Sequence, residues 1–159
     1  MKKLFALMSF TLAMVALTPA PAAADATLFW GFSSTPSTRS VKGFAAGISL
    51  VVVGFEFEYA NTKEDPLEAA PSVRTGMMNG LIQTPTKTQL YVTAGGGFFR
   101  ERLGSLGETS FGTNIGGGIK IPLAGPLRVR VDYRVFNLRG SDTLYKNPQR
   151  FYVGGNIAF

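Results

Sequence analysis

The chain has 159 residues, enough for one compact domain, and it carries a formal net charge of +6 with no cysteine and no histidine. An exported form would therefore have no disulfides, and it lacks the commonest general base and metal ligand. Nineteen glycines and thirteen phenylalanines disfavour a helical bundle, and the spread of arginines along strand-like segments argues against nucleic-acid binding.

Residues 1–26 have the pattern of a secretory signal peptide. Lys2 and Lys3 precede an apolar run at positions 4–17, and small residues follow as far as Ala26. A membrane-anchoring helix is the alternative, but the apolar run is short for a bilayer span and two prolines follow it. Cleavage is expected after Ala24 or after Ala26, and the remaining domain is assigned to positions 27–159. Cleavage after Ala24 would lower the net charge from +6 to +4.

The rest of the sequence alternates apolar and polar residues in segments that turn residues separate, which is the pattern of β-strands. The boundary between the second and third segments has no strong turn signal. Gly95, Gly96 and Gly97 leave the two faces of the fifth segment ambiguous. We predict eight strands, at positions 27–33, 41–48, 52–61, 73–82, 88–100, 109–121, 127–138 and 149–159.

An even number of strands about ten residues long, joined alternately by short turns and longer polar loops, is what a transmembrane barrel requires. Closure of the sheet also removes unpaired strand edges, which hydrocarbon cannot solvate. We therefore predict an all-β fold, an eight-stranded antiparallel up-and-down transmembrane β-barrel.

Charged residues alternate with apolar ones in two segments that would face each other across such a barrel. The third segment is acidic on one face and the seventh is mostly basic, so pairs such as Glu58 with Arg130 are expected inside. Burial of these charges is tolerable only if they are paired and hydrogen-bonded. We predict a lumen network of Glu56, Glu58, Arg128, Arg130, Asp132 and Arg134, with Lys120, Arg150, Tyr152, Asn114 and Asn156 around it.

Several of these segments resemble strands of the OmpA-like and OmpX-like outer-membrane β-barrel family. The resemblance rests on positions 91–97 (YVTAGGG), 111–120 (FGTNIGGGIK), 127–134 (LRVRVDYR) and 151–159 (FYVGGNIAF). It implies an outer-membrane location with both termini in the periplasm and with residues 34–40, 62–72, 102–107 and 140–148 outside. No peptidoglycan-binding domain is expected after the barrel.

The last segment is similar to the C-terminal signal that the barrel assembly machinery of the outer membrane reads. Its expected residues are Phe151, Val153, Ile157 and Phe159. The resemblance thus implies two partners, outer-membrane lipid and the assembly machinery. An eight-stranded barrel has room only for side chains, so we expect no open pore. We also expect a non-enzymatic structural or surface-interaction role, without cofactor or metal.

Two alternatives remain open at this point. A soluble periplasmic lipocalin-like barrel would bind an apolar ligand and would have apolar lumen residues and polar outer ones. A lipid A-modifying enzyme would need an activated nucleophile, and Ser105, Ser110 or Ser141 would have no histidine to pair with.

Overall fold

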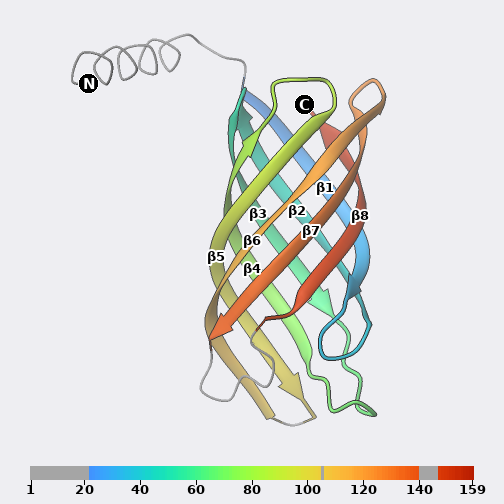
Figure 1. Ribbon diagram of the computed structural model, residues 1–159, viewed down its shortest axis with the longest axis vertical. Coiled ribbons are helices and arrows are strands. Elements are labelled where there is room, and N and C mark those ends of the chain that lie inside the picture. The colour runs from blue at the N-terminus through green and yellow to red at the C-terminus, as the bar shows by residue number, and fades with distance from the viewer. Residues whose placement is uncertain (1–21, 105, 140–146) are drawn as a thin grey trace, which may run out of the picture.

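The computed structural model describes residues 22–104, 106–139 and 147–159, and these residues form eight strands that close into one barrel (Figure 1). Each strand pairs antiparallel with its neighbours, and β8 closes the sheet on β1 from Asp25↔Ala158 to Ser33↔Arg150. The predicted all-β, antiparallel up-and-down barrel is confirmed. The strands are β1 (Ala22–Ser33), β2 (Arg39–Leu50), β3 (Val53–Thr62), β4 (Ser72–Gln83), β5 (Gln89–Leu103), β6 (Leu106–Ala124), β7 (Leu127–Arg139) and β8 (Gln149–Ala158).

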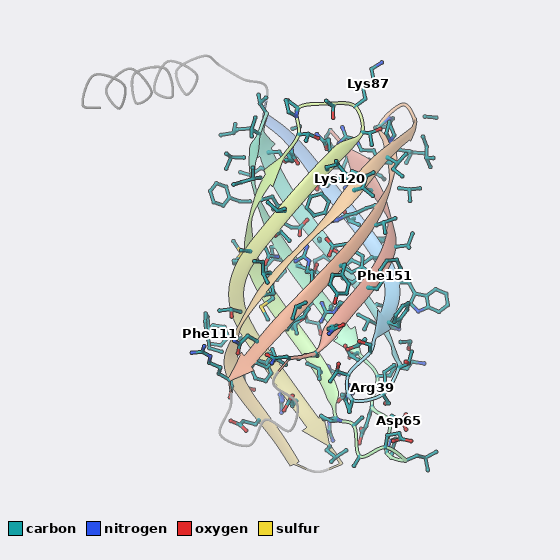
Figure 2. The ribbon with its side chains drawn as sticks, in the orientation of Figure 1. Arg39, Asp65, Lys87, Phe111, Lys120 and Phe151 are labelled. Carbon is teal, nitrogen blue, oxygen red and sulfur yellow. The ribbon has the colours of Figure 1, made fainter. Side chains whose placement is uncertain are left out.

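The two ends of the barrel have different connections. Turns of two residues, at positions 51–52 and 125–126, lie at the end where β1 begins and β8 ends. The five-residue connection 84–88 also lies at this short-turn end, and the opposite, long-loop end carries the connections 34–38 and 63–71 (Figure 2). Most of the predicted signal peptide, residues 1–21, and the segment 140–146 with Ser141 lie outside the described residues, as does Ser105.

Two predicted boundaries are wrong because strand pairing continues further than the alternation suggests. β1 begins at Ala22, where the predicted strand begins at Thr27. The expected loop at 102–107 is largely strand, since Arg102 pairs with Gly107 and Leu103 with Leu106. Gly104 turns the chain there at φ 60°, which glycine adopts without steric cost. Figure 1 shows the resulting β5–β6 hairpin extending beyond the end of β7.

The weakly predicted turn between β2 and β3 is made by two valines. Leu50 pairs with Val53, so only Val51 and Val52 connect the strands. Val51 has φ 43°, a conformation that a β-branched side chain rarely adopts. The pairing of the two strands therefore imposes this turn against the local preference of its residues.

The strands turn polar side chains inward and apolar ones outward. In β3, Glu56 and Glu58 are buried, whereas Phe55 is 58% exposed. The same holds for Leu28 and Ile115, which are 75% and 66% exposed on the outside. This inversion is the arrangement of a membrane barrel, in which the apolar face contacts lipid. The described ranges contain no helix with the length and hydropathy of a membrane span.

Candidate functional site: the charged lumen

Buried charges gather in the lumen and balance one another. Ten charged side chains of the described residues are buried, and five are cations and five are carboxylates. The cations are Arg39, Lys120, Arg130, Arg134 and Arg150, and the carboxylates are Asp25, Glu56, Glu58, Glu101 and Asp132. Matched charges of this kind avoid the high cost of an isolated ion in a low-dielectric interior.

Arg130 links the strands that face each other across the lumen. Its guanidinium pairs with Glu56 of β3 through Nη1 and with Asp132 of its own strand at 2.9 Å through Nη2. Its Nε donates to the Tyr91 hydroxyl at 2.7 Å, and its carbon lies 4.9 Å from the centroid of that ring. Arg130 is therefore surrounded by acceptors contributed by β3, β5 and β7.

Arg134 forms a second centre, two inward positions further along β7. It contacts three carboxylates, at 2.8 Å from Glu56, 3.2 Å from Glu58 and 2.9 Å from Asp132. Glu58 also accepts from Arg150 at 2.9 Å and from the Tyr152 hydroxyl at 3.0 Å. A connected set of ion pairs thus joins β3, β7 and β8.

The structure brings five of the six predicted network residues together and corrects two details. Arg128 is only half-buried and donates to Gln89 at 2.7 Å, near the short-turn end. Glu58 pairs with Arg134 and Arg150, and the described residues contain no Glu58–Arg130 ion pair. Because the strands of a barrel are staggered, residues that meet across the lumen lie at different positions along their strands. Counting positions along one strand therefore does not identify the ion-pair partner.

The residues predicted around the network are also inside. Lys120 pairs with Asp25 of β1, and Asn114 donates to Asn79 at 2.8 Å. Asn156 donates to Thr27 at 2.9 Å. The Lys120 and Asn156 contacts extend the polar lumen from the centre toward the short-turn end.

The sequence analysis missed two residues of the lumen network, Tyr91 and the Asp25 that pairs with Lys120. The Tyr91 hydroxyl donates to Asp132 and accepts from Arg130. The ring can lie across β6 because Gly118 is between Tyr91 and Asp132 in register, and a Cβ at 118 would overlap the tyrosine. Strict alternation along β5 places Tyr91 and Thr93 on the same face of the strand as Phe99. The three glycines between them left the faces ambiguous in the sequence.

An apolar cluster closes the lumen toward the long-loop end. It consists of Val73, Met77, Phe99, Phe136 and Leu138. The Arg150 guanidinium lies 4.3 Å from the Phe136 ring centroid, where the polar and apolar layers meet. The lumen is therefore filled by side chains of both kinds.

Beyond this cluster, Arg39 ties the loops together. Its guanidinium donates to Thr35 O at 2.8 Å and to Pro71 O, and Ser37 donates to Asp65 at 3.4 Å. Figure 2 labels Arg39 and Asp65 at the long-loop end, with Lys87 at the opposite end. The connections 34–38 and 63–71 thus form one joined surface.

The described residues offer little for nucleophilic catalysis. Ser110 has a partner, which the sequence analysis did not foresee, since its hydroxyl donates to Glu108 at 2.9 Å. A serine with a carboxylate but without an intervening base lacks the usual means of activation. The described residues contain no group of three potential metal ligands.

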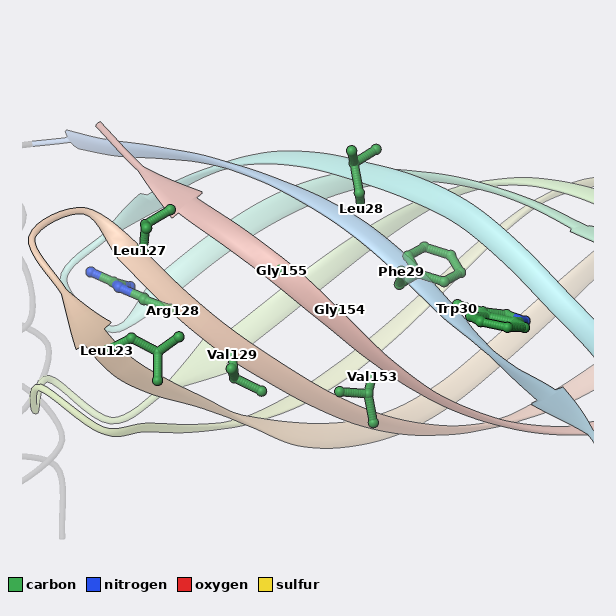
Figure 3. Close-up of a pocket in the computed structure, with 10 residues that line it drawn as sticks. All are labelled: Leu28, Phe29, Trp30, Leu123, Leu127, Arg128, Val129, Val153, Gly154 and Gly155. Carbon is green, nitrogen blue, oxygen red and sulfur yellow. The ribbon is translucent and has the colours of Figure 1, made fainter.

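The outer surface has a shallow apolar depression over β8 (Figure 3). Gly154 and Gly155 form its floor, and the side chains of β1, β6 and β7 surround it. A Cβ at Gly155 would meet no neighbouring atom within 4 Å, so the depression is open to the outside. Its lining includes Leu28, Trp30, Leu123, Leu127, Val129 and Val153.

Solved structures with a similar fold exist. The N-terminal β-barrel domain of Pseudomonas aeruginosa OprF matches with a TM-score of 0.66 at 15% identity, covering 86% of this chain and 97% of that one. Neisserial surface protein A matches with a TM-score of 0.61 at 17% identity, covering 86% and 94%. The chain has the fold of a small outer-membrane barrel.

This outer-membrane barrel fold is shared by proteins of different roles. The outer membrane enzyme PagL matches with a TM-score of 0.53 at 12% identity, covering 84% of this chain and 98% of that one. No protein-family model and no curated protein matches the sequence. The fold therefore does not choose between an enzyme and a structural or surface protein.

Proposed function

We propose that the chain is an integral protein of the outer membrane whose filled lumen passes no solute, and that its role is structural or at the cell surface. The observation that carries the proposal is the pairing of a neutral, connected charge network inside with an apolar surface outside. A side chain such as Trp30, 72% exposed on the outer face, is stable there only in contact with lipid or another apolar partner.

A soluble lipocalin-like barrel is the main alternative. It would need an apolar cavity and a polar exterior. Here Arg130, Arg134 and Glu58 fill the interior and Phe55, Phe98 and Ile115 lie outside, which is the reverse arrangement. The depression over β8 also suits acyl chains better than water, because its lining is apolar apart from Arg128.

Expression with membrane fractionation tests the location. We expect the protein in the outer-membrane fraction, with faster migration on SDS gels before boiling than after it. Recovery from a periplasmic extract without detergent would contradict the proposal. Liposomes containing the folded protein should swell in small sugars no faster than empty ones, and fast swelling would contradict the filled lumen.

The enzymatic alternative concerns lipid A. We propose a non-enzymatic role because the sequence contains no histidine to activate a serine. Mass spectrometry of lipid A from cells with and without the protein tests this. Identical lipid A species are expected, and loss of an acyl chain or gain of a group would overturn it.

The row Phe151, Val153, Ile157 and Phe159 is our proposed recognition signal for the barrel assembly machinery. All four side chains lie on the outer face of the last strand, although β8 itself ends at Ala158. Replacing Phe159 with alanine should lower the amount of heat-modifiable protein in the membrane without changing its in vitro refolding. Unchanged assembly in cells would refute the signal.

The resemblance to outer-membrane barrels also leads us to propose that the long-loop end faces outside. An epitope tag inserted in the connection 63–71 should then be accessible on intact cells. A tag accessible only after the outer membrane is permeabilised would refute this orientation.

A further inference from the structure

Two arginines occupy directly paired positions of neighbouring strands on the outer surface at the long-loop end. Arg74 of β4 and Arg100 of β5 are direct cross-strand partners, and both are exposed on the lipid-facing side of their strands. Arg102 follows at the next outward position of β5. Figure 1 shows that β4 and β5 are neighbouring strands that run to this end.

Like charges placed directly opposite each other in a sheet destabilise it unless an anion lies between them. In the lumen, the cations Lys120, Arg130, Arg134 and Arg150 each contact a carboxylate. Among the described residues, no carboxylate pairs with Arg74 or Arg100, and Arg102 donates only to the carbonyl of Gly104. An anion that neutralises these arginines must therefore come from outside the described chain.

The apolar surface next to Arg74 and Arg100 indicates what kind of anion fits there. Phe98, 67% exposed, lies two residues before Arg100 on the same face, and its ring packs edge-on against Phe111 at 5.9 Å. Met78 and Ile115 continue this apolar surface toward the middle of the barrel. A ligand that satisfies both parts has an anionic head next to the arginines and acyl chains along the apolar band.

The opposite end of the strands is different. Its outward positions are apolar, including Leu50, Val53, Ile82, Leu90 and Leu127. On the long-loop side, the register row that contains Arg74 and Arg100 continues through Asn61 to Lys42. The polar and cationic groups thus match only one leaflet of a bilayer.

We propose that Arg74 and Arg100, with Arg102 beside them, bind the phosphate groups of a phosphorylated lipid in the outer leaflet. This inference rests on the proposed outer-membrane location and orientation. The planar guanidinium groups can each present two N–H donors to one phosphate, which a lysine cannot do. Each arginine close to an anionic lipid surface strengthens binding by about fivefold, so the pair accounts for about 30-fold.

The test uses the full barrel folded in maltoside micelles, a detergent without phosphate. Binding is measured for diphosphorylated lipid A, for the same lipid with its phosphates removed, for inorganic pyrophosphate and for sucrose octasulfate. We expect diphosphorylated lipid A to bind at least tenfold more tightly than each of the other three. Heat-modifiable migration, checked separately, shows that the barrel is folded whatever the binding result.

Arg74→Gln with Arg100→Gln should weaken binding of diphosphorylated lipid A by about 30-fold. Arg74→Lys with Arg100→Lys should lose less, since the charges remain. The matched control, Lys87→Gln, removes an exposed cation at the opposite end of the barrel (Figure 2) and should bind within twofold of the wild type.

Three results would overturn the inference while leaving the outer-membrane barrel intact. They are equal binding by the wild type and by the folded Arg74→Gln, Arg100→Gln variant, equal binding of both forms of lipid A, and tighter binding of sucrose octasulfate or pyrophosphate than of the lipid. Failure of the wild type to fold as a heat-modifiable membrane protein would instead refute the proposed function.

Discussion

Replacing Arg134 with methionine removes the side chain that joins most of the lumen carboxylates while keeping much of its volume. Arg134 is fully buried and contacts Glu56, Glu58 and Asp132. Without it, the ten buried charges become four cations and five carboxylates. Breaking a buried ion pair on one side costs about 3–5 kcal/mol, so we expect the free energy of unfolding to fall by about 4 kcal/mol.

A double-mutant cycle with Glu58→Gln separates the ion pair from general packing. The single Glu58→Gln change should cost about 2 kcal/mol, because glutamine still accepts from Arg150 and Tyr152. Together with Arg134→Met it restores neutrality, and the double variant should be no less stable than Arg134→Met alone. A coupling energy of about 2–3 kcal/mol is expected.

Urea unfolding of the barrel in lipid vesicles measures these values. The single tryptophan, Trp30, is on the outer face and reports departure from lipid by its fluorescence. Arg139→Met is the matched control, since Arg139 is exposed on the same strand and should change stability by less than about 0.5 kcal/mol. Additive effects of Arg134→Met and Glu58→Gln would refute the network as the source of stability.

Three further predictions follow from the same contacts. Val51→Asn should stabilise the barrel by about 1 kcal/mol in urea unfolding, because asparagine tolerates the positive φ of this turn, and a loss of stability would contradict the strain. The mature protein should begin at Asp25 by N-terminal sequencing, because cleavage after Ala26 would remove the carboxylate that pairs with buried Lys120; a start at Thr27 would show that the pair is dispensable. Gly118→Ala should destabilise the barrel by about 1–3 kcal/mol by displacing Tyr91, whereas Gly155→Ala, in open space on the outer face, should be nearly neutral by the same assay.

The fold was predictable where alternation was strict. In β7, each of Arg130, Asp132 and Arg134 lies between apolar residues, so both the strand and its two faces could be assigned from sequence. The boundary of β1 could not, because Ala22 to Ala26 are the small residues expected before a signal peptidase site. Pairing with β2 from Ala22 onward, and with β8 from Asp25 onward, is what makes them strand.

The membership of the lumen network was predictable from side-chain parity, but its pairings were not. Parity tells which side of a strand a residue faces and says nothing of its height in the barrel. The stagger of the strands sets that height, so Glu58 meets Arg134 and Arg150 where counting positions suggested Arg130. Asp25 and Tyr91 were missed for local reasons, one assigned to a cleavage region and the other hidden beside three glycines.

The lumen arginines and the outer-face arginines of this barrel differ in the source of the anion that neutralises them. Arg130 and Arg134 have their carboxylates inside the same chain, because a cation in the lumen cannot rely on outside partners once the strands have closed. Arg74 and Arg100 lie on the outer face, where a partner can arrive after folding, and the described chain supplies them with no carboxylate. Since an uncompensated pair of cations lowers stability, a barrel that keeps them gains from a ligand at that position. The folded protein should therefore become more stable when phosphorylated lipid is present, and this gain should disappear in the Arg74→Gln, Arg100→Gln variant.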